Sequence, residues 1–296
     1  MPFVETKDIQ KEEPVSLYYQ DYGEGRPIIL IHGWPLSHQM WDRQVEDLVN
    51  AGYRVIAYDR RGFGLSDFPW NNYSYDQLAE DLRSIIIELN LYDATLVGFS
   101  MGGGEVVRYF TKYSNNRISQ AVLLSSIIPL VAQKTDNPDG VPHDDLNDIM
   151  DSLTSDRYKF LKGFGKNFVN YDDYSHIISE EQLHFNWTVA AYASNRATVE
   201  TAKAWAGTDF RSELKNVNVP TLIIHGTKDQ IVPIETSADQ AANGIANNRY
   251  EKIEDAPHGL VYTHAKKVNS LLIDFFNENK NDGKYSTHDP KLEVVS

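Results

Sequence analysis

The sequence predicts an α/β domain with a mostly parallel sheet and an inserted helical segment. Three observations lead to this prediction. Short apolar runs alternate with segments of helical spacing along most of the 296 residues. Several of these runs are continuous, as in residues 28–31 (Ile-Ile-Leu-Ile), which is typical of strands buried on both faces. From about residue 129 to residue 205 the strand runs stop, and helical, aromatic-rich stretches replace them.

The expected elements follow in chain order. Residues 16–22 alternate in polarity, which predicts an early antiparallel strand. Further strands are expected at residues 28–31, 54–58, 94–97, 121–124, 221–225 and 250–253. Residues 75–89 have helical spacing, with Leu78, Leu82 and Ile85 on one face and Asp76 near the start. Residues 263–279 are expected to form a closing helix.

These elements define the expected domain organisation. Residues 1–128 and 206–280 form one core domain, and residues 129–205 form a helical cap inserted into it rather than a separate domain. Residues 281–296 are polar and charged, so we expect this tail to fray or to be disordered.

The composition indicates a compact soluble protein. A formal net charge of −14, from 28 basic and 42 acidic residues, argues against nucleic acid or an anionic membrane as a partner. The absence of cysteine excludes disulfides, thiolate metal sites and iron–sulfur clusters. Residues 1–14 lack the apolar core of a secretory signal, and no run approaches the roughly 20 apolar residues of a membrane span. We therefore expect a cytoplasmic protein.

The segment Gly98-Phe99-Ser100-Met101-Gly102 predicts a nucleophilic serine. It joins the strand 94–97 to a helical run from residue 103, so Ser100 lies on a tight strand-to-helix turn. Such a turn needs small residues two positions to either side of the serine. It exposes the hydroxyl at the positive end of a helix, with the amide of Met101 directed at the reacting atom.

The partners of a reactive serine follow downstream. Asp229 comes just after the strand 221–225, and His258 comes in the loop after the strand 250–253. Each would be commonplace alone, the aspartate as a turn or helix-capping residue and the histidine as an ordinary loop residue. Together they give the order serine, acid, base at successive strand ends, which predicts a catalytic triad. The strand 121–124 ends in Ser125 without a carboxylate, so Asp229 has no rival for the acid.

The oxyanion hole needs a second backbone donor beside the amide of Met101. The run 28–31 breaks into His32-Gly33-Trp34-Pro35, where Gly33 permits a sharp turn that brings the amide of Trp34 toward Ser100. His32 is expected to brace this loop by hydrogen bonds rather than to act as a base, and His225 is expected to do the same in its own loop.

Five segments together resemble one known family. They are His32-Gly33-Trp34-Pro35, Asp59-Arg60-Arg61-Gly62-Phe63-Gly64-Leu65-Ser66, residues 98–105, residues 225–233 and Ala256-Pro257-His258-Gly259. The chain resembles the cofactor-free bacterial haloperoxidases and aryl esterases of the α/β-hydrolase superfamily, from about residue 15 to residue 276. The resemblance implies an eight-stranded, mostly parallel sheet with a helical cap, and it implies no cofactor and no metal. It also implies the same triad and the oxyanion amides of Trp34 and Met101.

The resemblance further implies acyl transfer from a small ester to water, or to hydrogen peroxide with formation of a peracid that oxidises halide. Pro35 is associated with the peroxide reaction in this family, although it could equally serve only to stiffen the turn. The expected pocket residues are Trp34, Val131, Phe164, Phe168, Trp205 and Ile231, with Phe160, Phe185 and Trp187 as further aromatics of the cap. They favour short acyl or aryl esters. Members often form dimers or trimers, so the resemblance allows a homo-oligomer but does not decide the subunit number.

Two alternatives from other classes stay open. The same three residues can cleave amides, lactams or carbon–carbon bonds. A relative with an intact triad can also serve as a ligand receptor with little turnover.

Overall fold

The computed structural model describes residues 2–10 and 13–279 of the chain. Within these residues, eight strands form one sheet in the order β1-β2-β4-β3-β5-β6-β7-β8. The strands are β1 (Phe3–Lys7), β2 (Pro14–Tyr22), β3 (Arg26–Ile31), β4 (Tyr53–Tyr58), β5 (Ala94–Phe99), β6 (Ile118–Leu124), β7 (Thr221–Gly226) and β8 (Asn248–Ile253). β2 pairs antiparallel with β1 and β4, and the remaining pairs are parallel. The predicted fold class is thereby confirmed.

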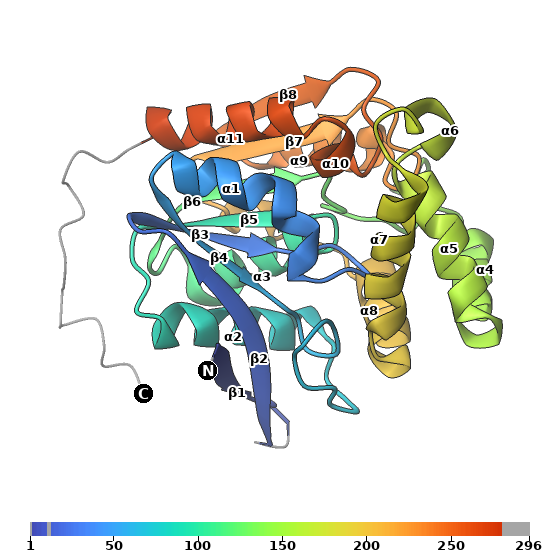
Figure 1. Ribbon diagram of the computed structural model, residues 1–296, viewed down its shortest axis with the longest axis horizontal. Helices are drawn as coiled ribbons and strands as arrows, with labels where there is room; N and C mark the ends of the chain where they lie inside the picture. The colour runs from blue at the N-terminus through green and yellow to red at the C-terminus, as the bar shows by residue number, and fades with distance from the viewer. Residues whose placement is uncertain (1, 11–12, 280–296) are drawn as a thin grey trace.

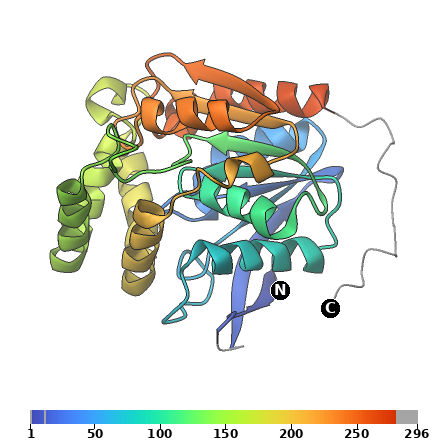
Figure 2. The same cartoon turned by 180° about the vertical axis from the view of Figure 1, so that it is seen from behind.

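Helices cover both faces of the sheet. Figures 1 and 2 show α1 (Asp42–Asn50) and α11 (Ala265–Glu278) over one face and α2 (Tyr75–Glu88), α3 (Gly102–Tyr113) and α9 (Ala238–Gly244) over the other. This double cover explains the continuous apolar runs, since every residue of β5 and β7 is buried. The start of α2 is fixed by Ser74, whose side chain accepts a hydrogen bond from the amide of Gln77.

The segment 129–205 contains helices rather than strands. These are α4 (His143–Ser155), α5 (Arg157–Phe168), α6 (Tyr171–Tyr174), α7 (Glu180–Tyr192) and α8 (Asn195–Gly207). α8 therefore runs two residues past the expected end of the cap. Figure 1 shows these helices grouped at one end of the sheet, the end at which the parallel strands finish. The short α10 (Leu260–Thr263) follows the last strand.

Two expectations concern the ends of the chain. β1 was not predicted from the polar start of the sequence, yet it pairs with β2 along its whole length, and Val4 and Thr6 are buried because β1 packs against α2. The expected tail, residues 281–296, lies outside the described residues. No described helix is both long enough and apolar enough to cross a membrane.

Candidate active site

Ser100 lies between β5 and α3, with a backbone φ of 51°. This left-handed conformation is unfavourable for a residue with a side chain and must be held by its surroundings. The turn also has no room for a side chain two residues before or after Ser100. A β-carbon on Gly98 would lie 2.6 Å from the carbonyl oxygen of Gly102, and one on Gly102 would lie 2.6 Å from that of Ile31. The two small residues that the sequence predicts are thus required by close backbone approach.

The structure brings Ser100, His258 and Asp229 into one hydrogen-bonded line. Nε2 of His258 lies 2.9 Å from Oγ of Ser100, and Nδ1 lies 2.7 Å from Oδ2 of Asp229. Asp229 follows β7 and His258 follows β8, so neighbouring strand ends bring the two together. His258 is almost fully buried, whereas Ser100 retains 6% exposure and lines a cavity. The geometry is that of a serine whose proton an imidazole can accept.

The carboxylate of Asp229 is held from both sides. Its Oδ1 accepts hydrogen bonds from the amides of Ile231 (2.9 Å) and Val232 (2.8 Å). Its Oδ2 is shared by His258 and by Nε2 of His225, which lies 3.1 Å away. Burial alone would raise the pKa of Asp229, but the adjacent His258 and the hydrogen bonds from His225 and His258 outweigh it, and the pKa falls below its ordinary value. Asp229 is therefore ionised at neutral pH.

The imidazole of His258 is also held by aromatic packing. The rings of Phe99 and Phe168 each have their centroids 5.1 Å from that of His258. The amide of Gly259 donates to the carbonyl oxygen of Phe168 at 2.6 Å. Phe168 thus supports the base from the cap. It does not line the cavity, and its prediction as a pocket residue is corrected, because its 3% exposed ring is covered by its neighbours at the histidine.

The two expected oxyanion donors both border the cavity. Trp34 and Met101 line it together with Ser100. Among the described residues, neither backbone amide donates to another backbone carbonyl outside the regular elements. The indole of Trp34 is anchored by a 3.0 Å hydrogen bond from Nε1 to the carbonyl oxygen of Thr198 on α8. Two backbone amides that remain available as hydrogen-bond donors beside a serine meet the requirement for an oxyanion hole.

His32 lies beneath this loop and is fully buried. Its Nδ1 donates to the carbonyl oxygen of Gly33 (2.9 Å), and its Nε2 accepts from the amide of Arg60 (3.0 Å). Burial, and then the charge of Arg60, lower the pKa of His32 well below its ordinary value, so the ring is neutral. The structure places His32 as a brace for the loop.

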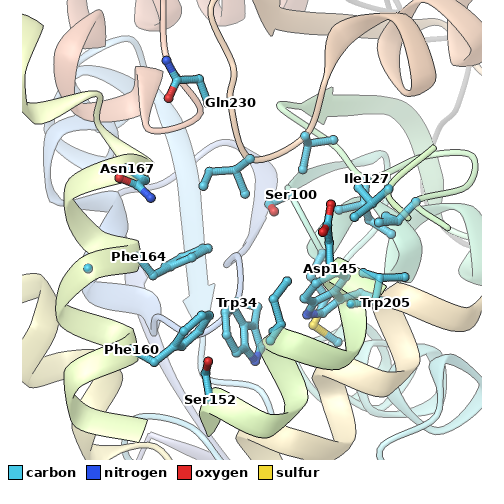
Figure 3. Close-up of a pocket in the computed structure, with 18 of the residues that line it drawn as sticks. Trp34, Ser100, Ile127, Asp145, Ser152, Phe160, Phe164, Asn167, Trp205 and Gln230 are labelled. Atoms are coloured by element: carbon cyan, nitrogen blue, oxygen red, sulfur yellow. The ribbon is translucent and has the colours of Figure 1, made fainter. Parts of the chain in front are cut away.

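A cavity of about 820 Å³ opens from Ser100 into the cap. Figure 3 shows Phe160 and Phe164 projecting from α5 toward Trp34. Of the six expected pocket residues, five line the cavity: Trp34, Val131, Phe164, Trp205 and Ile231.

The rest of the cavity wall departs from the expectation. Phe185 and Trp187 on α7 do not line the cavity. Phe185 is 40% exposed, and Trp187 donates to the carbonyl oxygen of Tyr158. Sequence reasoning missed the wall formed by α4, which includes Asp145, Leu146, Ile149 and Ser152. The spacing of Leu146, Ile149 and Leu153 was the available signal for an amphipathic helix there.

No group of three or more histidine, aspartate or glutamate side chains arranged to hold a metal ion occurs in residues 2–10 and 13–279.

Comparison with known proteins places the chain in a family of this fold. Residues 26–265 match the model of the alpha/beta hydrolase fold family. A protein of Synechocystis sp. named putative non-heme chloroperoxidase is 44% identical over 276 residues, which are 93% of this chain and 99% of that protein. The bifunctional esterase/perhydrolase DCH of Acinetobacter calcoaceticus is 34% identical over 93% of this chain and 99% of its own length. A crystal structure of a bromoperoxidase from Bacillus anthracis superposes with a TM-score of 0.89 at 42% identity, covering 93% of this chain and 99% of that one.

Proposed function

The chain belongs to the alpha/beta hydrolase fold family, and from this premise we propose that it hydrolyses small carboxylic esters through an acyl-enzyme on Ser100. The observation that carries the proposal is the unbroken line from Ser100 Oγ through His258 to Asp229, with contacts of 2.9 and 2.7 Å. A hydroxyl placed in this way is activated when the imidazole removes its proton.

The reaction begins when Oγ of Ser100 attacks the ester carbonyl carbon and its proton moves to Nε2 of His258. The amides of Trp34 and Met101 donate to the oxygen that becomes negative, and the carboxylate of Asp229 stabilises the imidazolium. His258 then returns the proton to the leaving alcohol or phenol oxygen as the carbon–oxygen bond breaks. Water then attacks the acyl carbon while His258 takes its proton. His258 returns that proton to Oγ of Ser100 as the bond between Oγ and the acyl carbon breaks, which releases the carboxylic acid and restores the serine.

Hydrogen peroxide can replace water in the second half of the reaction. Its oxygen attacks the acyl carbon and releases a peracid, which transfers its terminal OH oxygen to bromide to give hypobromous acid and the carboxylate. The relatives named chloroperoxidase and esterase/perhydrolase support this side activity, and so does Pro35 in the oxyanion loop.

The cavity supports a preference for neutral esters of modest size. Trp34, Phe160, Phe164 and Trp205 form an aromatic wall beside Ser100, with ring centroids 5.3 to 6.5 Å from that of Trp34. Apolar acyl or aryl groups gain roughly 0.8 kcal/mol for each methylene that such a wall removes from water.

The test is a panel of p-nitrophenyl esters from acetate to octanoate, with p-nitroacetanilide as the matched amide. Each is assayed with and without peroxide and bromide, on the parent protein and on Ser100→Ala. The proposal expects a burst of p-nitrophenol on the ester, little anilide cleavage and loss of every activity in the variant. Absence of any Ser100-dependent release of p-nitrophenol, in a burst or at steady state, would point to a receptor, and bromide oxidation that survives in Ser100→Ala would exclude the shared acyl-enzyme.

A further inference from the structure

The buried ion pair between Arg60 and Glu105 links the oxyanion loop to the nucleophile helix. We propose that this pair sets the separation of the two oxyanion amides, so that Arg60 and Glu105 are positioning residues for the transition state. The inference rests on the proposed function and assigns a role to two charged residues that touch neither substrate nor triad.

The contacts are specific. On the side of α3, Nε of Arg60 donates to Oε1 of Glu105 at 2.7 Å, and Nη2 donates to the same oxygen. The other carboxylate oxygen accepts from the hydroxyl of Tyr58 at 2.5 Å. On the side of the loop, Nη2 of Arg60 donates to the carbonyl oxygen of His32 at 2.7 Å, and its backbone amide donates to Nε2 of His32 at 3.0 Å.

These contacts connect the two amides through one side chain. Trp34 is two residues after His32, and Met101 is four residues before Glu105, at the turn that begins α3. A shift of Arg60 therefore moves one amide relative to the other. Oxyanion donors act only within about 2.7–3.1 Å of the developing charge, so a small change in their separation weakens one of the two bonds.

Stability alone does not account for the pair. Arg60 and Glu105 are each about 1% exposed or less, and taking two charges out of water costs several kcal/mol per ion. Burial raises the pKa of Glu105, and Arg60 opposes that rise without cancelling it. Apolar side chains of similar volume often serve a core equally well. A fixed geometry is what the charges add here.

The next residue provides a matched control. Arg61 forms an equally buried pair with Asp81 on α2, through Nε at 2.5 Å and Nη2 at 2.7 Å. Thr6 and Gln77 also donate to Asp81, so this pair fastens the same loop to β1 and α2 instead. It has no hydrogen bond to His32, Gly33 or Trp34 among the described residues. Arg61 also pairs with Asp8 at 3.7 Å. The two arginine–carboxylate pairs are otherwise alike in chemistry and burial, and they hold different elements.

The experiment compares Glu105→Gln with Asp81→Asn, each an isosteric loss of one buried carboxylate charge. Measured quantities are kcat and KM for p-nitrophenyl acetate, the inhibition constant of a trifluoromethyl ketone that forms a tetrahedral adduct on serine, and the free energy of unfolding. Glu105→Gln should lower kcat by about 10- to 100-fold, a fraction of the 10²- to 10³-fold effect of a lost donor. KM should stay the same, and ketone affinity should fall by the same factor. Asp81→Asn should destabilise the fold comparably and leave kcat within about twofold.

Equal kinetic effects in the two variants, or an unchanged kcat in Glu105→Gln, would overturn the inference while leaving the proposed function intact. A parent protein without Ser100-dependent hydrolysis would overturn both. If Glu105→Gln does not fold, the paired apolar variants Arg60→Met/Glu105→Leu and Arg61→Met/Asp81→Leu decide the question, since each removes both partners of its pair. The inference then requires the kcat loss in the first pair only.

Discussion

Replacing Asp229 by asparagine tests the acid with almost no change of shape. The two backbone amides that donate to Oδ1, from Ile231 and Val232, can be satisfied only by the carbonyl oxygen of the new amide. Its NH₂ group must therefore take the place of Oδ2, where it faces Nδ1 of His258 at 2.7 Å. Since the amide can only donate there, Nδ1 must become the acceptor, and the ring proton moves to Nε2.

The consequence for catalysis follows from this tautomer. With a proton on Nε2, His258 cannot accept the proton of Ser100. In a serine protease the same exchange lowers kcat about 10⁴-fold. At about 1.36 kcal/mol for each factor of ten, this equals about 5 kcal/mol of lost transition-state stabilisation. The fold should persist, because the two backbone hydrogen bonds remain.

The assay is the rate of acylation by p-nitrophenyl acetate in stopped flow, with thermal unfolding measured in parallel. Asp255→Asn is the matched control, since Asp255 is an exposed carboxylate close to His258 in sequence that pairs with Lys228. It should change the rate little. A rate for Asp229→Asn within tenfold of the parent would show that the carboxylate does not fix the tautomer of His258.

Four further predictions concern the loop, the cavity, the cap and pH. In Gly33→Ala the new β-carbon would lie 2.6 Å from Cδ1 of Phe99, so the loop must shift, and kcat for p-nitrophenyl acetate should fall by roughly 10²- to 10³-fold as one oxyanion donor is lost. Circular dichroism of the folded variant separates this from unfolding. Val131→Phe should shift the ester preference toward acetate, with kcat/KM for longer esters falling about fourfold for each methylene excluded, at roughly 0.8 kcal/mol each. An unchanged chain-length profile would place Val131 away from the acyl group. In Gly165→Ala the added β-carbon meets nothing within 4 Å, so α5 should gain roughly 0.5–1 kcal/mol, seen as a higher melting temperature. Because the pKa of Asp229 is lowered in the fold, its charge stabilises the folded state above the unfolded pKa of about 4. That contribution should disappear as pH falls through the folded pKa, and the difference in unfolding free energy between the parent and Asp229→Asn should shrink accordingly.

The succession of strands along the chain and the placing of Ser100, Asp229 and His258 at strand ends could be predicted because both are local patterns. A parallel sheet collects its strand ends at one edge, so three loops far apart in sequence are brought together. The glycine-flanked turn around Ser100 can be recognised from its local sequence. The crowding at Gly98 comes from Gly102 in the same turn, although the crowding at Gly102 comes from Ile31 on the neighbouring β3.

Features that depend on long-range packing could not be predicted. β1 is short and polar in composition, and only its place in the sheet beside α2 shows that Val4 and Thr6 face inward. Phe164 and Phe168 are four residues apart on α5, so the helical period predicts that they lie on the same face. In the structure Phe168 packs against His258, whereas Phe164 lines the cavity. The partners Arg60 and Glu105 are 45 residues apart, and no spacing rule joins them.

The segment 129–205 leaves the core after β6 and re-enters before β7, two strands that pair directly with each other. This segment can therefore be replaced by one of another shape without interrupting any strand of the sheet. However, the segment also makes hydrogen bonds to the loops that carry the catalytic acid and base. The carbonyl oxygen of Phe168 accepts from the amide of Gly259, next to His258. The side chain of Asn170 donates to the carbonyl oxygen of Lys228, next to Asp229, so the segment holds both loops in place. A replacement segment that changes substrate specificity must therefore preserve these two hydrogen bonds.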